Sequence, residues 1–418
     1  MDFYEIEGGT PLVGEVSING AKNAALPLMA ASLLSSEPSV LHRVPDIEDV
    51  HTMADLLRSL GARVEWQGKG SLMIQAGPGL SPRLPDELTR KMRASVLLMG
   101  PLLARLGEVE LSHPGGCAIG PRPINLHLDG LRYLGAQVTA EAGALRATTT
   151  GLQGTLIVLD FPSVGATENL MLAATAAKGV TIVRNAAREP EIVELQDFLN
   201  KMGARIRGAG TDTIRVRGVR ELHGAEHRVI PDRIEAATFL VAGAVTRGRV
   251  TVADVIPEHL EAVLAKLEAA GCTVEEGNDL VEVSLQGRPA PIAFRALPYP
   301  GFPTDAQPQM CVLCALADGV SLVHENVFAQ RFHHLEELMR MGANVFHEGG
   351  YAVITGVSKL TGATVEAADL RGGAALVLAG LAAEGITRVE RAYHMDRGYE
   401  SFAEKMQSLG AQLKRLSN

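Results

Sequence analysis

The sequence predicts an α/β protein of two domains, a two-domain inside-out α/β barrel with buried helices and sheets outside. Three observations predict this class: the length of 418 residues, an aliphatic composition, and a signature that recurs six times. At about 100–200 residues per domain, the chain is long enough for two or three domains with sizeable cores. Hydrophobic residues make up 46% and aromatic residues only 4%, so Ala, Val, Leu and Ile must fill those cores.

The repeated signature is a stretch of helix-forming residues, a glycine, a small residue and then an alternating strand pattern. It reads LRSLGARVE at residues 57–65 and returns as LRYLGAQVT at residues 131–139 and KMQSLGAQL at residues 405–413. Its glycines recur about every seventy residues, which indicates a chain of six structural repeats. These glycines are Gly61, Gly135, Gly203, Gly271, Gly342 and Gly410.

Each signature contains the end of an amphipathic helix. In the first unit, apolar residues three or four apart form one stripe on a 3.6-residue helix, at Val50, Met53, Leu57 and Leu60. The glycine that follows suits the left-handed conformation at a helix C-terminus. Residues 62–66 then alternate between apolar and polar, as a half-buried strand does.

A second helix precedes each signature and is rich in small and aliphatic residues. Examples are residues 239–247 and 376–384, each closed by a glycine and followed by a short strand. A helix that is apolar on all sides is buried, whereas the amphipathic helices are half exposed. The pattern therefore predicts the same order of elements in each unit: helix, strand, loop, helix and strand, with one more strand before the next unit. Helices inside and sheets outside are the reverse of a (β/α) barrel.

The six units are too many to share one core. Single hydrophobic cores stop growing beyond ~250–300 residues, so we expect three units in each domain. The boundary in the middle of the chain is predicted near residues 228–231. The cleft between the domains is the default place for a ligand.

Composition excludes several classes of protein. The net charge is −9, from 39 basic and 48 acidic residues, which argues against a general nucleic-acid binder because phosphate neutralisation needs a basic surface. No segment approaches the ~18 uninterrupted apolar residues of a membrane span, and the first residues do not resemble a signal peptide. Four cysteines are too few for a disulfide scaffold and fit a reducing compartment. We therefore expect a cytoplasmic protein without nucleic-acid or membrane partners.

Cationic residues stand at the starts of the apolar helices, where the positive end of the helix dipole opposes them. Asp or Ser at such a position is an ordinary N-cap, which explains Asp369 and Ser163. Capping does not explain cations, so we expect a ligand with several negative charges at these helix ends. The cations are Lys22, Arg93, Arg233 and Arg371 at helix starts, and Arg122, Arg331 and Arg397 in loops nearby.

Cys117 lies in a segment that cannot form a helix or a strand, since residues 114–123 contain three Gly and three Pro. We expect a surface loop that closes as a lid. Arg122 would favour the thiolate form of Cys117 and make it reactive. An incidental exposed cysteine is the alternative.

The other candidates for chemistry have ordinary alternatives. Cys311 and Cys314 form a C-x-x-C in an apolar helix without further ligands nearby, so core packing is favoured, and no metal or cofactor is predicted. Asp305 follows a stiff turn and is either a helix N-cap or a general base for a substrate hydroxyl. The sequence lacks GxxxxGK[ST], GxGxxG and GxSxG motifs, so nucleotide-hydrolase, Rossmann and serine-hydrolase interpretations have no support.

Ordered motifs along essentially the whole chain resemble the UDP-N-acetylglucosamine enolpyruvyl transferase family. The motifs are NGAKN at 19–23, MRAS at 92–95, PGGC at 114–117, GPRP at 120–123, SVGAT at 163–167, AREPE at 187–191, PDRIE at 231–235, FPTD at 302–305, RF at 331–332, DLR at 369–371 and DRGY at 396–399. The resemblance implies one domain of residues 22–229 and another of residues 1–21 plus 230–418, with the active site in the cleft between them. It also implies domain closure over the ligands.

The resemblance implies transfer of the enolpyruvyl group of phosphoenolpyruvate to the 3′-hydroxyl of UDP-N-acetylglucosamine, with release of phosphate, by addition and then elimination. This reaction is the first committed step of bacterial peptidoglycan synthesis. By analogy, Cys117 protonates C3 of phosphoenolpyruvate, and Asp305 deprotonates or orients the sugar hydroxyl. Fosfomycin, which alkylates the loop cysteine in this family, is therefore expected to inactivate the enzyme.

The resemblance also assigns residues to each substrate. Phosphoenolpyruvate would be held by Lys22, Asn23, Arg122 and Arg397, of which Lys22 and Arg397 also belong to the catalytic set. UDP-N-acetylglucosamine would contact Arg93, Arg122, Pro123, Ile124, Asn125, Leu126, Ser163, Val164, Gly165, Asp305 and Val327. The cleft would be lined by Glu189, Arg233, Arg331, Asp369 and Arg371. Asn125 stands where some relatives have Asp, and Gly372 and Gly373 stand where others have Ala and Ser, but neither change removes a catalytic group.

Two alternatives stay open at the level of the sequence. A shikimate 3-phosphate enolpyruvyl transferase would share the repeat and the basic cleft, but that family lacks the cysteine loop and the SVGAT segment. A non-catalytic paralogue that only binds UDP-sugars would need neither Cys117 nor Asp305 and Lys22. Retention of all three residues argues against it.

Overall fold

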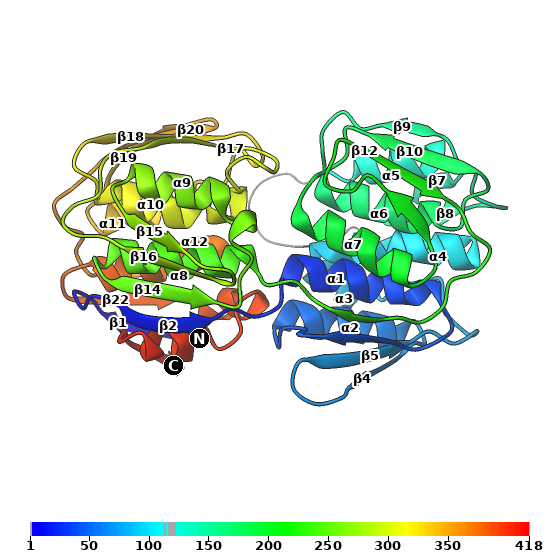
Figure 1. Ribbon diagram of the computed structural model, residues 1–418, viewed down its shortest axis with the longest axis horizontal. Helices are drawn as coiled ribbons and strands as arrows, with labels where there is room; N and C mark the ends of the chain where they lie inside the picture. The colour runs from blue at the N-terminus through cyan, green and yellow to red at the C-terminus, as the bar shows by residue number, and fades with distance from the viewer. Residues whose placement is uncertain (1, 113, 116–122, 142, 418) are drawn as a thin grey trace. The chain divides into compact units, whose positions relative to one another are not determined.

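The computed structural model describes the chain except for residues 1, 113, 116–122, 142 and 418. The described residues form two compact units, with boundaries between Asn19 and Gly20 and between Ile230 and Pro231. We call the unit between these boundaries the internal unit, and the unit formed by both ends of the chain the terminal unit (Figure 1). Each unit has a hydrophobic core of its own.

The described part of the internal unit contains three sheets. The first has the order β13-β3-β5-β4, formed by Glu226–Arg228, Ser39–His42, Ser71–Gln75 and Arg63–Trp66. The second has the order β6-β8-β7, formed by Glu108–Ser112, Ala144–Thr148 and Gln137–Glu141. The third has the order β11-β12-β10-β9, formed by Arg205–Arg207, Thr213–Arg217, Val180–Arg184 and Leu156–Val158. The helices are α1 (Lys22–Ala31), α2 (Glu48–Ser59), α3 (Asp86–Lys91), α4 (Met99–Leu106), α5 (Asn125–Tyr133), α6 (Val164–Ala174) and α7 (Pro190–Lys201).

The described part of the terminal unit also contains three sheets. The first has the order β15-β16-β14-β2, formed by Thr273–Glu276, Leu280–Ser284, Arg249–Ala253 and Val13–Ser17. The second has the order β17-β18-β20-β19, formed by Ala293–Ala296, Val320–Glu325, Tyr351–Thr355 and Asn344–Glu348. The third has the order β21-β22-β1-β23, formed by Thr364–Glu366, Ile386–Glu390, Asp2–Glu7 and Gln412–Ser417. The helices are α8 (Arg233–Val245), α9 (Glu261–Ala269), α10 (Gln307–Ala315), α11 (His333–Arg340), α12 (Leu370–Ala382) and α13 (Phe402–Ser408).

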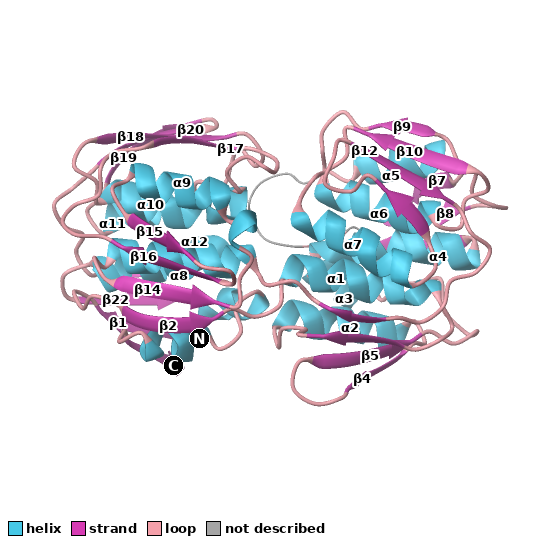
Figure 2. Cartoon of the chain, viewed as in Figure 1, coloured by secondary structure: helices cyan, strands magenta, loops and turns pink. Residues whose placement is uncertain are grey.

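Two kinds of helix make up each unit, and the difference follows from their residues. All but the first residue of α8 are buried, because its side chains are small or aliphatic on every side. In contrast, α11 buries only three of its eight residues. Figure 2 shows helices enclosed by strands within each unit. Strands such as β12 bury every second residue, so one sheet face packs on the helices and the other is exposed.

The six signature glycines all have positive φ angles, between +90° and +99°. Each follows the last turn of an amphipathic helix and precedes a strand, as in α2, Gly61 and β4. A residue with a Cβ atom is strained in this conformation, which explains why the sequence repeats glycine at this point. The predicted helix ends are confirmed.

The predicted extra strand pairs in parallel with the strand that follows the buried helix in five of the six described sheets, as β2 does with β14 over five residues. The sheet of β6 is the exception. There the chain makes one isolated bridge between Arg83 and Glu110. It then turns at Pro85 into α3, so no described strand pairs with the end of β6 at Ser112 on that side.

The fold is mixed α/β, as predicted, but no sheet in the described part of the chain closes on itself, and the predicted inside-out barrel is not confirmed. The physical reason is that each unit divides its strands among separate sheets, which have free edges. The origin of the units in six repeats stays a prediction.

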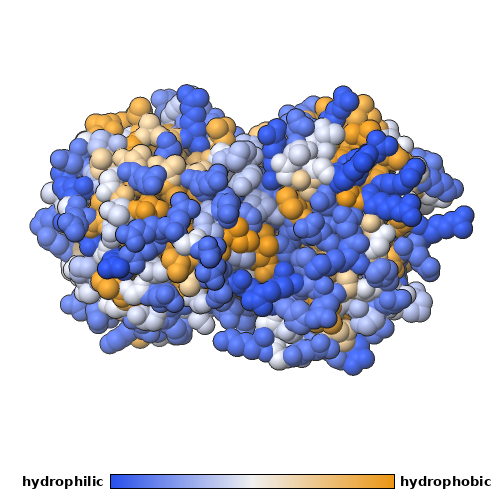
Figure 3. All heavy atoms as spheres, viewed as in Figure 1, coloured by the Kyte–Doolittle hydropathy of each residue, from blue (hydrophilic) through white to orange (hydrophobic). Residues whose placement is uncertain are grey.

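The face drawn in Figure 3 is mainly hydrophilic, with scattered apolar patches. Exposed apolar side chains include Phe346 and Tyr351 on β19 and β20. No helix in the described residues is both long and apolar enough to cross a membrane.

The predicted core positions of Cys311 and Cys314 are confirmed, since both lie in the apolar core of the terminal unit, and Cys272 lies in the same core. Burial raises the pKa of Cys314 and of Cys272 to about 12 and that of Cys311 above its usual value. These thiols therefore stay protonated and packed.

Candidate active site

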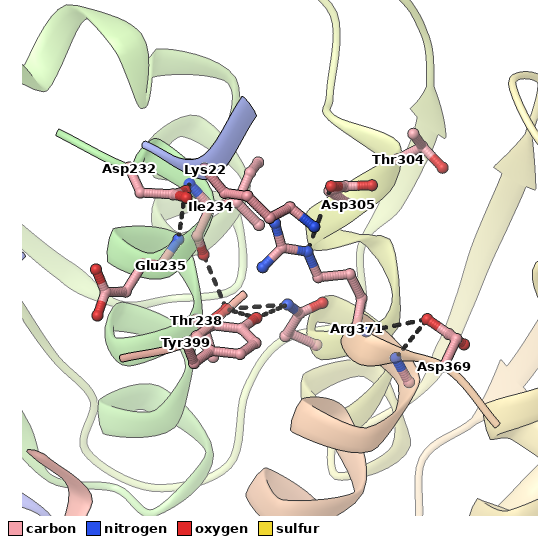
Figure 4. Close-up of polar contacts among 12 residues, drawn as sticks. Lys22, Asp232, Ile234, Glu235, Thr238, Thr304, Asp305, Asp369, Arg371 and Tyr399 are labelled. Carbon is pink, nitrogen blue, oxygen red and sulfur yellow. Dashed lines mark hydrogen bonds and ion pairs between the residues drawn. The ribbon is translucent and has the colours of Figure 1, made fainter. Parts of the chain in front are cut away.

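Asp305 lies before α10, close to Arg371 and Asp369 at the start of α12 in the terminal unit (Figure 4). Arg331, which precedes α11, joins this group. Asp305 belongs to a short 3-10 turn, η4 (Thr304–Ala306), that leads into α10. Arg331 Nη1 donates to Asp305 Oδ1 at 2.6 Å. Arg371 Nε donates to Asp305 Oδ2 at 3.3 Å. Each carboxylate oxygen of Asp305 therefore has a guanidinium partner, and the N-cap interpretation of Asp305 is wrong.

Asp369 is the N-cap of α12, as predicted. Its Oδ1 accepts hydrogen bonds from the backbone N–H groups of Arg371 at 2.9 Å and Gly372 at 3.2 Å. The same oxygen lies 4.0 Å from Arg331 Nη2. The Asp369 carboxylate thus caps the N-terminus of α12 and also faces Arg331. Arg331 therefore lies between Asp305 and Asp369.

Both arginines are almost completely buried, with 4% of Arg331 and 1% of Arg371 exposed. Burial alone would lower their pKa values, but other groups outweigh it. Asp305 and Asp369 raise the pKa of Arg331. Tyr399, Asp305 and Asp232 raise the pKa of Arg371. Burying a cation is costly unless its donors are used. Among the described residues, Arg371 Nη1 and Nη2 have no hydrogen-bond partner. Asp305 is 27% exposed, so a ligand can reach this group.

Glu325 supports the segment that carries Val327. Its Oε1 accepts from the backbone N–H groups of Val327 at 2.8 Å and Phe328 at 3.0 Å. Its Oε2 accepts from Thr304 Oγ1 at 2.9 Å. The loop with Val327 is therefore tied to the turn that carries Asp305.

A second polar network lies next to the arginines and joins Tyr399, Thr238 on α8 and Gln309 on α10. Tyr399 is 3% exposed, and its hydroxyl lies 2.9 Å from Thr238 Oγ1. Gln309 Nε2 donates to both oxygens, at 2.9 Å to Thr238 and 3.3 Å to Tyr399. The Arg371 guanidinium carbon lies 5.1 Å from the centre of the Tyr399 ring, within the range of a cation–π contact.

The start of α8 carries a further predicted cation. Asp232 caps this helix through bonds of 2.8 Å and 3.0 Å to the N–H groups of Ile234 and Glu235. Arg233, the first helical residue, is half-buried and lies 5.7 Å from the Tyr299 ring centre. Arg397 ends a 3-10 turn, η5 (Ala392–Arg397), and is also half-buried.

In the internal unit, Lys22 is the first residue of α1 and Asn23 the second. Lys22 Nζ donates to Asp49 Oδ2 on α2 at 3.3 Å, and both side chains are largely buried. The N-terminal end of α1 has no side-chain cap. Asp49 thus supplies the negative charge that offsets a lysine placed against the helix dipole.

The starts of α5 and α6 hold most of the residues assigned to the nucleotide sugar. Ser163 caps α6 by accepting from the N–H of Ala166 at 3.3 Å, which confirms the predicted cap. Val164 and Gly165 begin this helix, and a side chain at position 165 would meet the ring of His127 on α5. The other assigned residues are Ile124, the N-cap of α5, Asn125 and Leu126 in its first turn, Pro123 before it, and Arg93 at the start of a 3-10 turn, η2 (Arg93–Leu98).

Three carboxylates are buried near one another at α6 and the start of α7: Glu168, Glu189 and Glu191. Burial, and then the charges of Glu191 and Glu189, raise the pKa of Glu168 well above its usual value. Glu189 precedes the first residue of α7, and its Oε2 accepts from the backbone N–H of Arg188 at 3.0 Å. Burial and the two neighbouring carboxylates therefore favour the protonated, neutral form of Glu168.

The structure thus brings together Asp305, Arg331, Asp369 and Arg371 within the terminal unit. Cys117 and Arg122 lie outside the described residues. Sequence reasoning missed Asp49, Glu325 and the role of Tyr399. Asp49 is an ordinary acidic residue in the first turn of an amphipathic helix, and Glu325 ends a strand, so neither has a distinctive local pattern.

Comparison with known proteins identifies the family. A family model described as EPSP synthase (3-phosphoshikimate 1-carboxyvinyltransferase) matches residues 6–406. UDP-N-acetylglucosamine 1-carboxyvinyltransferase 1 of Symbiobacterium thermophilum is 54% identical over 99% of this chain and 95% of that protein. UDP-N-acetylglucosamine 1-carboxyvinyltransferase of Shewanella woodyi is 51% identical over the full length of both. The chain belongs to the UDP-N-acetylglucosamine 1-carboxyvinyltransferase family.

Solved structures of enolpyruvyl transferases share the fold of this chain. The enolpyruvyl transferase NikO from Streptomyces tendae matches 100% of this chain and 99% of that protein, with a TM-score of 0.90 and 26% identity. EPSP synthase from Acinetobacter baumannii matches the whole of both chains with a TM-score of 0.77 and 21% identity, and it shares the fold alone. The EPSP synthase family model therefore supports the fold. The relatives of 54% and 51% identity support membership of the UDP-N-acetylglucosamine 1-carboxyvinyltransferase family.

Proposed function

We propose that this chain transfers the enolpyruvyl group of phosphoenolpyruvate to the 3′-hydroxyl of UDP-N-acetylglucosamine, with release of phosphate. The observation that carries the proposal is whole-length identity of 50–54% to relatives named for that reaction. The reaction is the first committed step of peptidoglycan synthesis, and the protein would act in the cytoplasm. The shikimate 3-phosphate reaction is supported only by the description of the wider family model and by structures of about 21% identity, so it is not favoured.

The proposed chemistry is an addition followed by an elimination. A proton added to C3 of phosphoenolpyruvate makes C2 electrophilic, and the sugar 3′-oxygen bonds to C2 as its own proton leaves. The tetrahedral intermediate then loses phosphate from C2 and a proton from C3, which restores the double bond. Cys117 is the proposed acid, because a thiol can titrate near neutral pH.

Asp305 is the proposed partner of the sugar hydroxyl. The bonds to Arg331 and Arg371 support this role, because they fix both carboxylate oxygens in one orientation. Two guanidinium partners also suit the carboxylate form, which accepts a hydrogen bond from a hydroxyl. The 27% exposure of Asp305 leaves access for the substrate.

The remaining assignments follow the family resemblance. Lys22, Asn23, Arg122 and Arg397 would hold the phosphate and carboxylate of phosphoenolpyruvate. The starts of α5 and α6, with Arg93 and Val327, would hold UDP-N-acetylglucosamine, and Glu189 and Arg233 would line the site. These residues come from both units, so we propose that the predicted two domains share one active site. We also propose that both domains derive from six repeats of one unit of about seventy residues.

The proposal is tested by measuring phosphate release from phosphoenolpyruvate with the purified protein. We expect release that depends on UDP-N-acetylglucosamine in the wild type and is lost in Cys117→Ala. Release driven by shikimate 3-phosphate instead would contradict the substrate assignment. Binding of UDP-N-acetylglucosamine without any release by the wild type would favour a non-catalytic paralogue.

A further inference from the structure

We infer that Tyr399 is a positioning residue for the proposed reaction, which holds the guanidinium of Arg371 through the network with Thr238 and Gln309. The inference rests on the proposed function for its kinetic consequence, and on the geometry of the terminal unit alone for the contact itself. Tyr399 lies between η5 and α13, outside the helices that carry the arginines. Its hydroxyl links α8 to α10, and its ring faces a residue of α12.

The order of donors in this network follows from one bond. Thr238 Oγ1 donates its only hydrogen to the carbonyl oxygen of Ile234 at 2.8 Å. Thr238 can therefore only accept from Tyr399, so the phenol O–H is the donor in their 2.9 Å contact. The Tyr399 oxygen in turn accepts from Gln309 Nε2 at 3.3 Å. Every hydrogen in the network has a stated acceptor, which fixes the position of the phenol oxygen.

The contact with the Tyr399 ring restricts rotation of the Arg371 guanidinium. Arg371 uses only Nε in a hydrogen bond, to Asp305, and that single bond does not fix rotation of the guanidinium. The Tyr399 ring centre at 5.1 Å restricts this rotation and determines where Nη1 and Nη2 point. Those buried nitrogens have no hydrogen-bond partner among the described residues, so their N–H groups can donate to an acceptor on a ligand.

The backbone of Tyr399 is fixed as well. Its N–H, like that of Gly398, donates to the carbonyl oxygen of Met395, at 3.0 Å and 3.1 Å respectively. Arg397 lies two residues before Tyr399 at the end of η5. A change at Tyr399 therefore acts on Arg371 through the ring and on the end of η5 through the backbone.

Burial agrees with a phenol that keeps its hydrogen. Tyr399 is buried, and this burial raises its pKa, although the charge of Arg371 lowers it in part. The neutral hydroxyl remains a donor to Thr238 throughout the pH range in which the enzyme would work.

The kinetic test compares Tyr399→Phe, which keeps the ring, in two backgrounds: wild type and Arg371→Lys. If Tyr399 acts through Arg371, Tyr399→Phe lowers kcat by ~10-fold in the wild type, with little change in KM, and by less than ~2-fold when Arg371 is already replaced. A general structural role gives the same loss in both backgrounds, and that result, or no loss at all, overturns the inference. Tyr4→Phe is the matched control, because Tyr4 is also a buried tyrosine of the terminal unit and does not contact Arg371.

Two variants of Thr238 test the same network if Tyr399→Phe does not fold. Thr238→Val removes the acceptor of the phenol and should lower kcat to a similar degree, whereas Thr238→Ser restores the acceptor and most of the lost rate. Equal rates for Val and Ser contradict the network.

A measurement without turnover separates this inference from the proposed function. The Nε–Hε NMR signal of Arg371, assigned by its loss in Arg371→Lys, should shift in Tyr399→Leu, which removes the ring, and not in Tyr4→Phe. An unchanged signal in Tyr399→Leu overturns the inference even if the enzyme is active. A shifted signal in a protein without sugar-dependent phosphate release keeps the contact and rejects only the reaction.

Discussion

His334 is a buried imidazole near the arginine cluster, with 3% of the residue exposed and no partner for Nε2 among the described residues. Burial, and the charge of Arg331 to a smaller extent, lower its pKa to about 3. In the unfolded chain the pKa returns to about 6.5, so the unfolded state binds the extra proton between these values. The contribution of His334 to stability is therefore present above pH 6.5 and is lost by about 1.4 kcal/mol per pH unit as the pH falls.

We predict that His334→Gln, which cannot titrate, loses less stability on acidification than the wild type. Denaturant unfolding at pH 7, 6 and 5 measures the free energy of unfolding of both proteins. This free energy should fall more steeply with falling pH in the wild type than in His334→Gln. His51→Gln is the control, because His51 is exposed and paired with Asp46. A wild type and a variant with parallel pH dependence would contradict the burial argument.

Single residues also show what the sequence could predict about the site. Arg331, Arg371 and Asp305 were identifiable, because cations at helix starts and a carboxylate after a stiff turn are unusual local patterns. Asp49 was not identifiable, since an acidic residue in the first helical turn is ordinary and only the fold places it 3.3 Å from Lys22. The role of Tyr399 likewise depends on contacts with α8, α10 and α12, which lie far away in the sequence.

At the scale of elements, β6 differs from its counterparts because no described strand pairs with its outer edge at Ser112. The Ser112 hydroxyl is buried, with 3% of the residue exposed, yet it has no hydrogen-bond partner among the described residues. Ser95 is fully buried, but its hydroxyl has partners: its Oγ lies 2.8 Å from the carbonyl oxygen of Met92 and 3.1 Å from that of Thr89. The two serines therefore form a matched pair for one substitution.

We predict that Ser112→Ala is neutral or stabilising, because it removes a buried hydroxyl without a hydrogen-bond partner among the described residues, whereas Ser95→Ala costs about 1 kcal/mol. Thermal or denaturant unfolding of both variants measures the contrast. A larger loss for Ser112→Ala than for Ser95→Ala would show that Ser112 has a partner in the folded protein.

The elements themselves were largely predictable, because the helix period, the closing glycine and the alternating strand are all local signals. The extra strand before each unit was predicted as well, and five of the six described sheets contain it. It fails beside β6 because the chain turns at Pro85, which is the N-cap of α3. A short helix of six residues has too little apolar periodicity to be recognised beforehand.

At the scale of the whole molecule, the prediction of more than one core agrees with the two apolar clusters, one in each compact unit. Strand order could not be predicted, because β1 and β2 at the N-terminus join sheets formed by residues near positions 386–417 and 249–284. Pairing over such separations is set by the packing of complete elements and leaves no local pattern. The inside-out barrel stays a prediction for the same reason, since the joining of sheets is a property of several elements together.

The central claim is that the two substrates become one product on this protein. The most direct measurement is mass spectrometry of UDP-N-acetylglucosamine after incubation with phosphoenolpyruvate and the purified chain. We predict a nucleotide sugar in which one enolpyruvyl group replaces one hydrogen, formed together with an equal amount of phosphate and absent with Cys117→Ala. An unmodified nucleotide sugar in the presence of a folded wild-type protein would contradict the account.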